Sequence, residues 1–258
     1  MEIVLIGSGS VATHLGLALQ SKGVVIKQVF SRNPVNAESL ANKLGTTFVD
    51  DIANLYMNAD IYIYALKDSA LKSVLRKMDM PNGIHVHTAG SIPMSDFEGY
   101  TSRFGVFYPL QSFSIQKEVD FKEIPICIEA CSAEIQQVLV NLAKLLTDKI
   151  YTVNSEQRKK LHLAAVFACN FTNYMYDIAS QILDDSDIKF EIIQPLIAET
   201  ANKIKTLSPY DAQTGPAVRF DETTIARHLH MLNKTPEICK IYSLLSKNIH
   251  KRHKKNNY

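Results

Sequence analysis

The first residues that could do chemistry are glycines at the end of a short apolar run. Residues 7–12 read Gly-Ser-Gly-Ser-Val-Ala, which has the form G-x-G-x-x-A. In this pattern the first glycine permits a tight turn, the second lets a pyrophosphate approach the backbone, and the small last residue keeps helix and strand close. The following helix N-terminus supplies amide donors. Because residues 2–6 predict a strand and an amphipathic helix follows, we expect a dinucleotide to bind at Gly7, Ser8, Gly9, Ser10, Val11 and Ala12. A purely structural turn is the alternative.

The end of the second predicted strand, residues 24–30, indicates which dinucleotide is bound. An NAD site typically has an acidic residue here that accepts a hydrogen bond from the ribose 2′-hydroxyl. This chain has Ser31 and Arg32 instead, and no acid before Glu38. A guanidinium and a hydroxyl can bind a 2′-phosphate, which a carboxylate would repel. The sequence therefore predicts NADP as the cofactor, although Arg32 could also be a solvated loop residue or stack on adenine.

Two further stretches follow predicted strands of the same sheet. Residues 65–68 end the strand at 61–66, and residues 87–91 end the strand at 84–87. Ligands of open α/β sheets bind at the carboxyl ends of the strands. We expect the first stretch to cover the ribose and phosphates and the second to lie near the nicotinamide. The predicted cofactor contacts are Ala65, Leu66, Lys67, His87, Thr88 and Gly90.

Three polar residues lie in an otherwise apolar helical pattern over residues 155–183. The spacing of His162, Asn170 and Asn173 places them near one stripe of the helix. Unpaired polar groups are costly to bury, so they either bond to nearby backbone or face a wet cleft between the domains. In the second interpretation His162 exchanges a proton near neutral pH as general acid or base. Asn170 and Ser91 would then orient the substrate.

Strands and helices must alternate to place these residues. Nine of the ten glycines lie at or before Gly105, which is typical of tight strand-to-helix turns, and the glycine-poor remainder suits long helices. The sequence predicts an α/β domain over residues 1–152, with a mostly parallel sheet and helices on both faces. An all-helical substrate and dimerisation domain follows over residues 153–258. Its expected helices cover 155–183, 188–207 with a kink or restart at Pro195, 222–232 and 236–249.

The middle of the first of these helices, residues 163–169, is apolar on all sides. Such a helix is expected to be buried, and roughly a hundred residues can hardly cover it alone. The sequence therefore predicts a homodimer in which the helices after Asn154 pack across a two-fold axis and bury more than ~2,000 Å².

Composition limits the remaining function classes. The chain has 28 basic and 26 acidic residues, but residues 247–258 hold five basic residues and no acid, so the rest is slightly acidic. We therefore expect no nucleic-acid partner, and we interpret the basic C-terminal stretch as a solvated tail. The four cysteines lack metal-ligand spacing, so no metal site is expected. Without a signal peptide or a long apolar run, a cytoplasmic protein with no membrane segment is expected.

Several motifs together resemble a known family. They are the glycine turn, residues 87–91, the stretch Tyr-Pro-Leu-Gln-Ser-Phe at 108–113, residues 161–170, and Thr-Gly-Pro-Ala-Val-Arg-Phe-Asp at 214–221 running to His228. The N-terminal half resembles the Rossmann domains of pyrroline-5-carboxylate reductase, deazaflavin-dependent NADP oxidoreductases and the 6-phosphogluconate dehydrogenase group. The whole chain resembles bacterial proteins that join such a domain to a helical domain of unknown function. The resemblance implies NADP binding and a dimer, but no established substrate.

Two residues depart from the family pattern. Tyr108 replaces a histidine that would titrate near neutrality, and Phe220 replaces a glycine. The leading hypothesis is an NADP-dependent oxidoreductase that transfers hydride between nicotinamide and a small carbonyl, imine or hydroxy substrate. Because of Tyr108, the alternative is a non-catalytic regulator or sensor that binds NADP(H).

Overall fold

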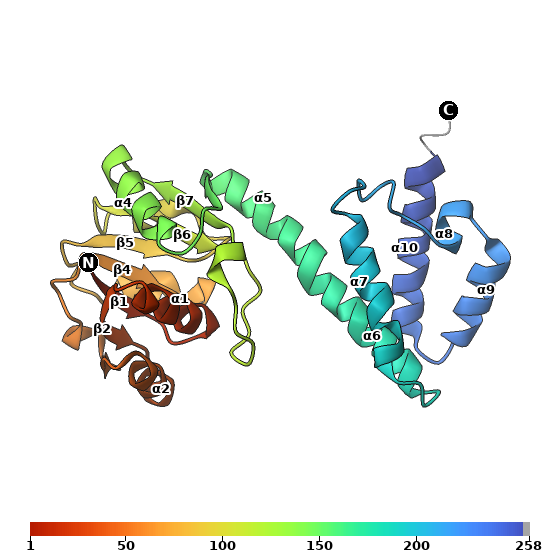
Figure 1. Ribbon diagram of the computed structural model, residues 1–258, viewed down its shortest axis with the longest axis horizontal. Coiled ribbons are helices and arrows are strands. Elements are labelled where there is room, and N and C mark those ends of the chain that lie inside the picture. The colour runs from red at the N-terminus through yellow and green to blue at the C-terminus, as the bar shows by residue number, and fades with distance from the viewer. Residues whose placement is uncertain (255–258) are drawn as a thin grey trace. The chain divides into compact units, whose positions relative to one another are not determined.

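The computed structural model describes residues 1–254 of the chain. Two compact units divide between Asn170 and Phe171. Figure 1 shows the helices and strands of each unit. The predicted domain boundary at residues 152 and 153 lies earlier in the chain, just before the helix α5 (Ser155–Ala165).

Within the described residues, the first unit is built on one eight-stranded sheet with the order β3-β2-β1-β4-β5-β6-β7-β8. All neighbouring strands are parallel except β6 and β7. This mostly parallel α/β architecture confirms the predicted fold class. The strands are β1 (Glu2–Ile6), β2 (Val25–Phe30), β3 (Thr47–Val49), β4 (Ile61–Tyr64), β5 (Ile84–His87), β6 (Phe104–Pro109), β7 (Ile126–Ala130) and β8 (Ile150–Thr152).

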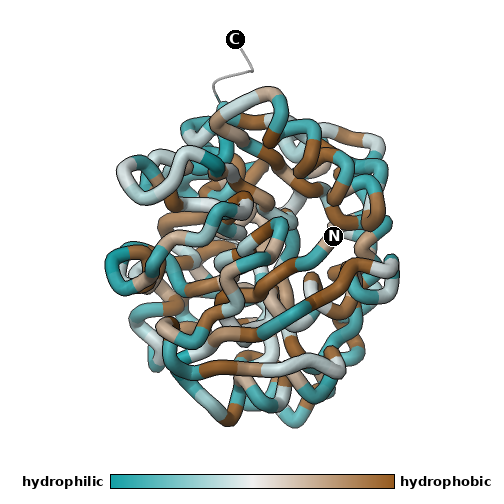
Figure 2. Tube along the Cα trace, turned by 90° about the vertical axis from the view of Figure 1, so that its left-hand side faces the viewer, coloured by the Kyte–Doolittle hydropathy of each residue, from teal (hydrophilic) through white to brown (hydrophobic). Residues whose placement is uncertain are grey.

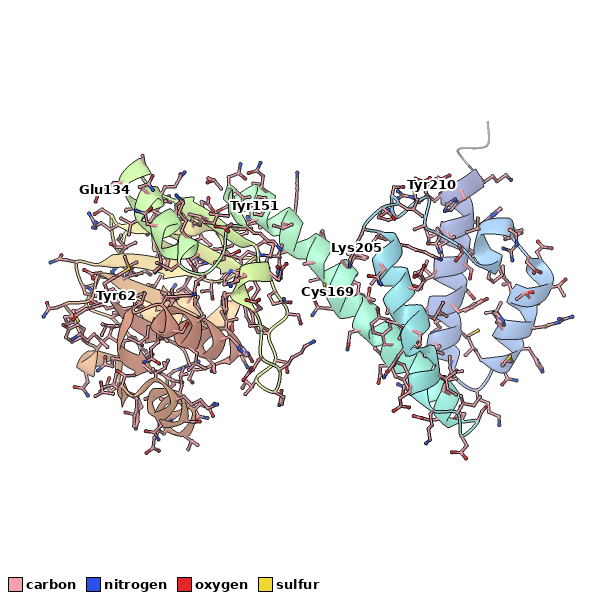
Figure 3. The ribbon with its side chains drawn as sticks, in the orientation of Figure 1. Tyr62, Glu134, Tyr151, Cys169, Lys205 and Tyr210 are labelled. Atoms are coloured by element: carbon pink, nitrogen blue, oxygen red, sulfur yellow. The ribbon has the colours of Figure 1, made fainter. Side chains whose placement is uncertain are left out.

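Alternate residues of the central strands point to opposite faces, and each face has its own hydrophobic core. Ile3 and Leu5 pack on one face with α1 (Ser10–Ser21), α2 (Pro34–Leu44) and α4 (Ala133–Lys144). Val4 and Ile6 pack on the other face with the short helix α3 (Leu71–Leu75). Tyr62 lies among the strands, and Glu134 lies on α4 at the surface (Figure 3). In Figure 2 the hydrophobic stretches run through the interior, while hydrophilic residues dominate many outer turns.

Local capping explains why α2 begins and ends where the sequence predicts. The Asn33 side chain accepts a hydrogen bond from the amide of Asn36, and Pro34 occupies the first helical position. Gly45 ends the helix in the left-handed conformation, with φ of +57°. The start of α2 is therefore fixed close to the end of β2.

The long helical pattern after Asn154 differs from the prediction in two respects. A π-helical segment, Val166–Phe171, separates α5 from α6 (Thr172–Asp184), although the ribbon continues through it (Figure 1). The expected burial is also absent in the single chain, because the Leu163 side chain is 59% exposed. The wider π turn also changes the angular positions of the residues that follow it.

The second unit continues as helices. They are α7 (Gln194–Lys203), α8 (Pro216–Arg219), α9 (Glu222–Met231) and α10 (Pro236–Lys254). Pro195 lies in the first turn of α7, where the sequence predicts a kink or restart. Tyr210 stacks on His253 of α10, with ring centroids 4.2 Å apart (Figure 3).

The basic residues near the C-terminus lie mostly on a helix. Lys247, Lys251, Arg252 and Lys254 belong to α10, whereas Lys255 lies outside the described residues. Within residues 1–254, no helix combines the length and apolar character needed to cross a membrane.

Candidate cofactor and active site

A cavity of about 660 Å³ opens at the carboxyl ends of the parallel strands in the first unit. Pockets of this size are typical of small-molecule sites. It is lined by residues 7–11, 30–33, 36, 65–68, 70, 74, 88–90, 108, 109, 111, 113 and 162. Most of the residues predicted to contact a cofactor therefore lie around one cavity.

The glycine turn after β1 has the geometry that a bound phosphate requires. Gly7 has φ of +126°, and a Cβ atom there would lie 2.1 Å from the carbonyl oxygen of Ala65. Only glycine fits this approach of two backbone segments. At Gly9 a Cβ would meet nothing within 4 Å, so the space above the turn is open. Ala12 is fully buried beneath the turn and does not line the cavity.

Hydroxyl and guanidinium groups gather where β2 ends. The Ser8 hydroxyl donates to Ser31 Oγ over 2.9 Å, which ties the glycine turn to the second strand. Arg32 lines the cavity, is exposed, and forms no ion pair within residues 1–254. Its charge is therefore available to an anionic ligand.

Asn33 and Asn36 also line the cavity, and sequence reasoning missed both as binding residues. Asn33 also caps α2, because its side chain accepts a hydrogen bond from the amide of Asn36. The available signal was that this helix begins directly after β2, at the same edge of the sheet as the glycine turn.

The loops after β4 and β5 supply the opposite side of the cavity. Ala65, Leu66 and Lys67 line it, as do Thr88 and Gly90. Thr88 is held by its amide, which donates to the carbonyl of Tyr64 over 3.1 Å. These loops therefore border the cavity next to the glycine turn.

His87 and Ser91 occupy different places from their neighbours in the same loop. The His87 side chain is 1% exposed, stacks on Phe97 and does not line the cavity. The Ser91 hydroxyl donates to a carboxylate oxygen of Asp68, which does line the cavity. Ser91 thus joins the two loops, and its predicted contact with a substrate remains a prediction.

His162 is the predicted catalytic residue that the structure brings to the cavity. It lies on α5, lines the cavity, and its Nδ1 atom is 3.1 Å from the hydroxyl of Tyr108. Burial raises the pKa of Tyr108 to about 12, so this phenol is protonated at neutral pH. Asn170, by contrast, is exposed in the π-helical segment and does not line the cavity, so its predicted role in orienting a substrate remains a prediction.

A buried ion pair fixes the start of α5, and sequence reasoning did not find it. The Arg158 side chain is fully buried, contacts a carboxylate oxygen of Glu129 on β7, and donates to the carbonyl of Ile92. Glu129 also accepts hydrogen bonds from the amide and hydroxyl of Ser155, at 2.9–3.0 Å. In the sequence, Arg158 looks like any charged residue in the first turns of a surface helix. Its burial depends on pairing across the fold.

Two buried histidines of β5 lie behind the cavity. His85 bonds to the hydroxyl of Tyr64 through Nδ1 and to the carbonyl of Pro81 through Nε2, each over 2.9 Å. Burial lowers the pKa of His85 to about 4. Both ring nitrogens are satisfied by the neutral form.

The second histidine, His87, is less completely bonded. Its Nδ1 accepts from the amide of Ala89 over 3.2 Å, but Nε2 is buried with no hydrogen-bond partner. Burial, and then the nearby charge of Arg158, lower the pKa of His87 to about 3. The carbonyl of Pro93 opposes this shift, but by less than burial and Arg158 lower the pKa. His87 is therefore a neutral core residue.

Two family descriptions match separate parts of the chain. The family described as "NADP oxidoreductase coenzyme F420-dependent" matches residues 2–87. A domain of unknown function, DUF2520, matches residues 124–249. Among curated proteins, none matches the chain.

Solved structures extend this likeness over the whole chain. A protein from Bacteroides fragilis, provisionally described as an NADP oxidoreductase, is 48% identical, with a TM-score of 0.92 and coverage of 97% of this chain and 98% of that one. An imine reductase from Myxococcus stipitatus in complex with NADP+ is 16% identical, with a TM-score of 0.71 and coverage of 99% and 95%. A 1-pyrroline-5-carboxylate reductase from Streptococcus pyogenes is 13% identical, with a TM-score of 0.65 and coverage of 97% and 98%. The last two show a shared fold. At 48% identity over nearly the whole of both chains, the protein belongs to the same family as the Bacteroides fragilis protein, a family of NADP oxidoreductases that carry a C-terminal DUF2520 domain.

Proposed function

We propose that the protein is an NADP-dependent oxidoreductase that transfers hydride between the nicotinamide and a small carbonyl, imine or hydroxy compound. The observation that carries this proposal is the composition of one cavity. It has a glycine turn and Arg32 at one part of its lining, and His162 paired with Tyr108 at another. Residues suited to binding phosphates and a residue suited to exchanging a proton thus line the same cavity.

The residues of the cavity fit NADP. Gly7 and Gly9 leave the turn free of side-chain atoms, and the N-terminus of α1 directs its amides toward the place of the pyrophosphate. Ser31 and Arg32 would hold a 2′-phosphate, because no carboxylate precedes them to repel it. When bound, the nicotinamide supplies or accepts the hydride.

The protein's own part in the reaction is proton exchange and orientation. His162 lies where α5 borders the cavity, and a histidine can give or take a proton near neutral pH. Lys67, Asp68 and Thr88 offer further polar groups in the same lining. This arrangement favours a reaction over simple binding of the cofactor.

A cofactor titration tests the first half of the proposal. By titration calorimetry the protein should bind NADPH more tightly than NADH. The variant Arg32→Ala should weaken NADPH binding by about 1.5–3 kcal/mol, the range for a charged hydrogen bond, and leave NADH binding nearly unchanged. Arg76→Ala is the matched control, because Arg76 is exposed and lies outside the cavity lining. Equal losses for both cofactors in Arg32→Ala would contradict the role of Arg32.

A substrate panel tests the second half. Oxidation of NADPH should be followed by its absorbance with carbonyls, imines and coenzyme F420, which the description of the matching N-terminal family names. Turnover with one class identifies the reaction. If NADPH binds tightly but none of these compounds is reduced, the non-catalytic alternative replaces the enzyme.

We also propose that the protein acts as a homodimer through its helices. Large apolar side chains are exposed in the single chain, including Leu163 on α5, Leu196 on α7 and Leu244 on α10. Exposed large apolar side chains of this kind are typical of residues that an obligate interface covers, and such interfaces bury more than ~2,000 Å². Light scattering should give the mass of a dimer at micromolar concentration, and a monomer would refute this assembly.

A further inference from the structure

The hydrogen bond between Tyr108 and His162 engages one particular nitrogen of the imidazole. The Tyr108 hydroxyl lies 3.1 Å from Nδ1, and the two rings meet edge to face at 68°, with centroids 6.2 Å apart. Both residues line the cavity. The nitrogen left over is Nε2, which has no hydrogen-bond partner among residues 1–254.

Gly90 packs against the same edge of the imidazole. A Cβ atom on Gly90 would lie 2.6 Å from Nδ1, 2.7 Å from Cγ and 2.8 Å from Cβ of His162. The edge that carries Nδ1 is therefore in contact with protein. In an imidazole ring Nδ1 is bonded to Cγ, whereas Nε2 is separated from Cγ by Cδ2 on one side and by Cε1 and Nδ1 on the other. Nε2 is therefore the nitrogen farther from this packed edge.

The direction of the hydrogen bond follows from the surroundings of Tyr108. Its side chain is largely buried, and its pKa is raised by burial, then by Cys127 and more weakly by Asp68, with Arg158 opposing, so the hydroxyl keeps its proton. A buried hydroxyl needs an acceptor. Within the described residues, Nδ1 of His162 is the partner that this hydroxyl has. The hydroxyl therefore donates to Nδ1, and the hydrogen of the neutral imidazole must be on Nε2.

We infer that Tyr108 is a positioning residue that sets the tautomer of His162, so that the neutral ring presents Nε2–H to the cavity. Gly90 assists because its missing side chain leaves room for the ring. A ring in this tautomer donates a hydrogen bond, so the reacting group of the substrate must accept one. A carbonyl oxygen or a neutral imine nitrogen meets that requirement, and the N–H of an iminium ion does not. This choice of substrate class rests on the proposed function, whereas the tautomer does not.

Nitrogen NMR of the full-length protein labelled with ¹⁵N-histidine tests the tautomer directly. The signals of His162 are assigned from their loss in His162→Gln, at a pH where the ring is neutral. The wild-type ring should carry its hydrogen on Nε2. In Tyr108→Phe the ratio of the two tautomers should change about fivefold, the effect of losing one neutral hydrogen bond.

A second histidine pair in the chain provides the matched control. In the helical unit the Tyr242 hydroxyl lies 2.8 Å from Nδ1 of His228. The variant Tyr242→Phe should alter the signals of His228 and leave those of His162 unchanged. Circular dichroism checks that both variants fold.

Two results would overturn the inference: a wild-type His162 with its hydrogen on Nδ1, or a folded Tyr108→Phe variant whose His162 signals do not change. The first is read from the wild-type spectrum once His162→Gln has assigned the signals, so it does not depend on whether Tyr108→Phe folds. In the substrate panel, neutral carbonyls or imines should react and permanently cationic iminium compounds should not. The reverse selectivity would refute the substrate class. An inactive protein with the expected tautomer would refute the proposed function but leave the tautomer intact.

Discussion

The two buried histidines of β5 should make the protein lose stability in mild acid. His85 and His87 have pKa values lowered to about 4 and about 3 by burial, compared with 6.5 for an unperturbed histidine. Between the lowered pKa of each histidine and 6.5, the unfolded chain binds a proton at that residue and the folded chain does not. The free energy of unfolding therefore falls as the pH falls. The loss starts near pH 6.5 and continues to about pH 4 for His85 and about pH 3 for His87.

The size of the effect follows from these values. At pH 5 each histidine is almost fully protonated in the unfolded chain and almost fully neutral in the folded one. Each therefore lowers the free energy of unfolding by about 2 kcal/mol relative to pH 7, and the pair lowers it by about 4 kcal/mol. Domains are typically stable by only about 5–15 kcal/mol, so this loss is large. Most carboxylates remain ionised above pH 5, so they contribute little to this interval.

Urea denaturation at pH 7 and pH 5 measures the loss. The variant His87→Asn retains an acceptor for the amide of Ala89 and should lose about half of the pH dependence, even if it is less stable at both pH values. His14→Asn is the control, because His14 is partly exposed on α1 and bonds to the carbonyl of Ser114 over 2.9 Å. If the wild-type free energy of unfolding is the same at pH 7 and pH 5, the two histidines are not held neutral and the reasoning fails.

Three further substitutions test the site and its support. Once a substrate has been identified, His162→Ala should bind NADPH normally by calorimetry and lose ~10²–10⁴ in turnover rate. His14→Ala should keep both properties. Full activity in His162→Ala would show that His162 has only a structural role. Arg158→Met should lower the free energy of unfolding by about 3–5 kcal/mol in urea denaturation, because it leaves the largely buried carboxylate of Glu129 without a counter-charge. A loss below about 1 kcal/mol would show that the ion pair is dispensable. Gly7→Ala should abolish NADPH binding or folding, because the added Cβ would meet a backbone oxygen. Gly23 also has a positive φ but has open space around it, so Gly23→Ala should lower the free energy of unfolding by only about 1–2 kcal/mol in thermal melts. Similar small costs at both glycines would refute the steric argument.

Much of the fold could be predicted because local signals in the sequence coincide with the elements. The glycine turn, the Asn33 and Pro34 start of α2 and the buried apolar strands all act over a few residues. The antiparallel direction of β7 was not predicted. It depends on the segment between β6 and β7, which contains no long helix of the kind that joins parallel strands. The π-helical segment was missed for a similar reason, since helical spacing in the sequence does not distinguish α from π turns.

The residues of the candidate site also divide into those that a local sequence pattern could predict and those that it could not. Arg32 and the glycine turn could be found because their role follows from their place at a strand end. The burial of Arg158 and the pairing of Tyr108 with His162 join residues more than twenty positions apart, so no local pattern carries them. His87 shows the limit of reasoning from position alone, because it precedes residues that line the cavity but is itself buried and does not line it.

The anchorage of Arg158 has a consequence for motion. Its guanidinium binds the carbonyl of Ile92, two residues after Gly90, and it lies one helical turn before His162 on α5. The loop after β5 and the first turns of α5 are therefore coupled as one rigid body, and thermal fluctuations should displace them together. Backbone order parameters of the two segments should be equally high on the picosecond to nanosecond timescale. Among the segments that line the cavity, larger fluctuations are then expected outside these two, for example in the segment that carries Gln111 and Phe113.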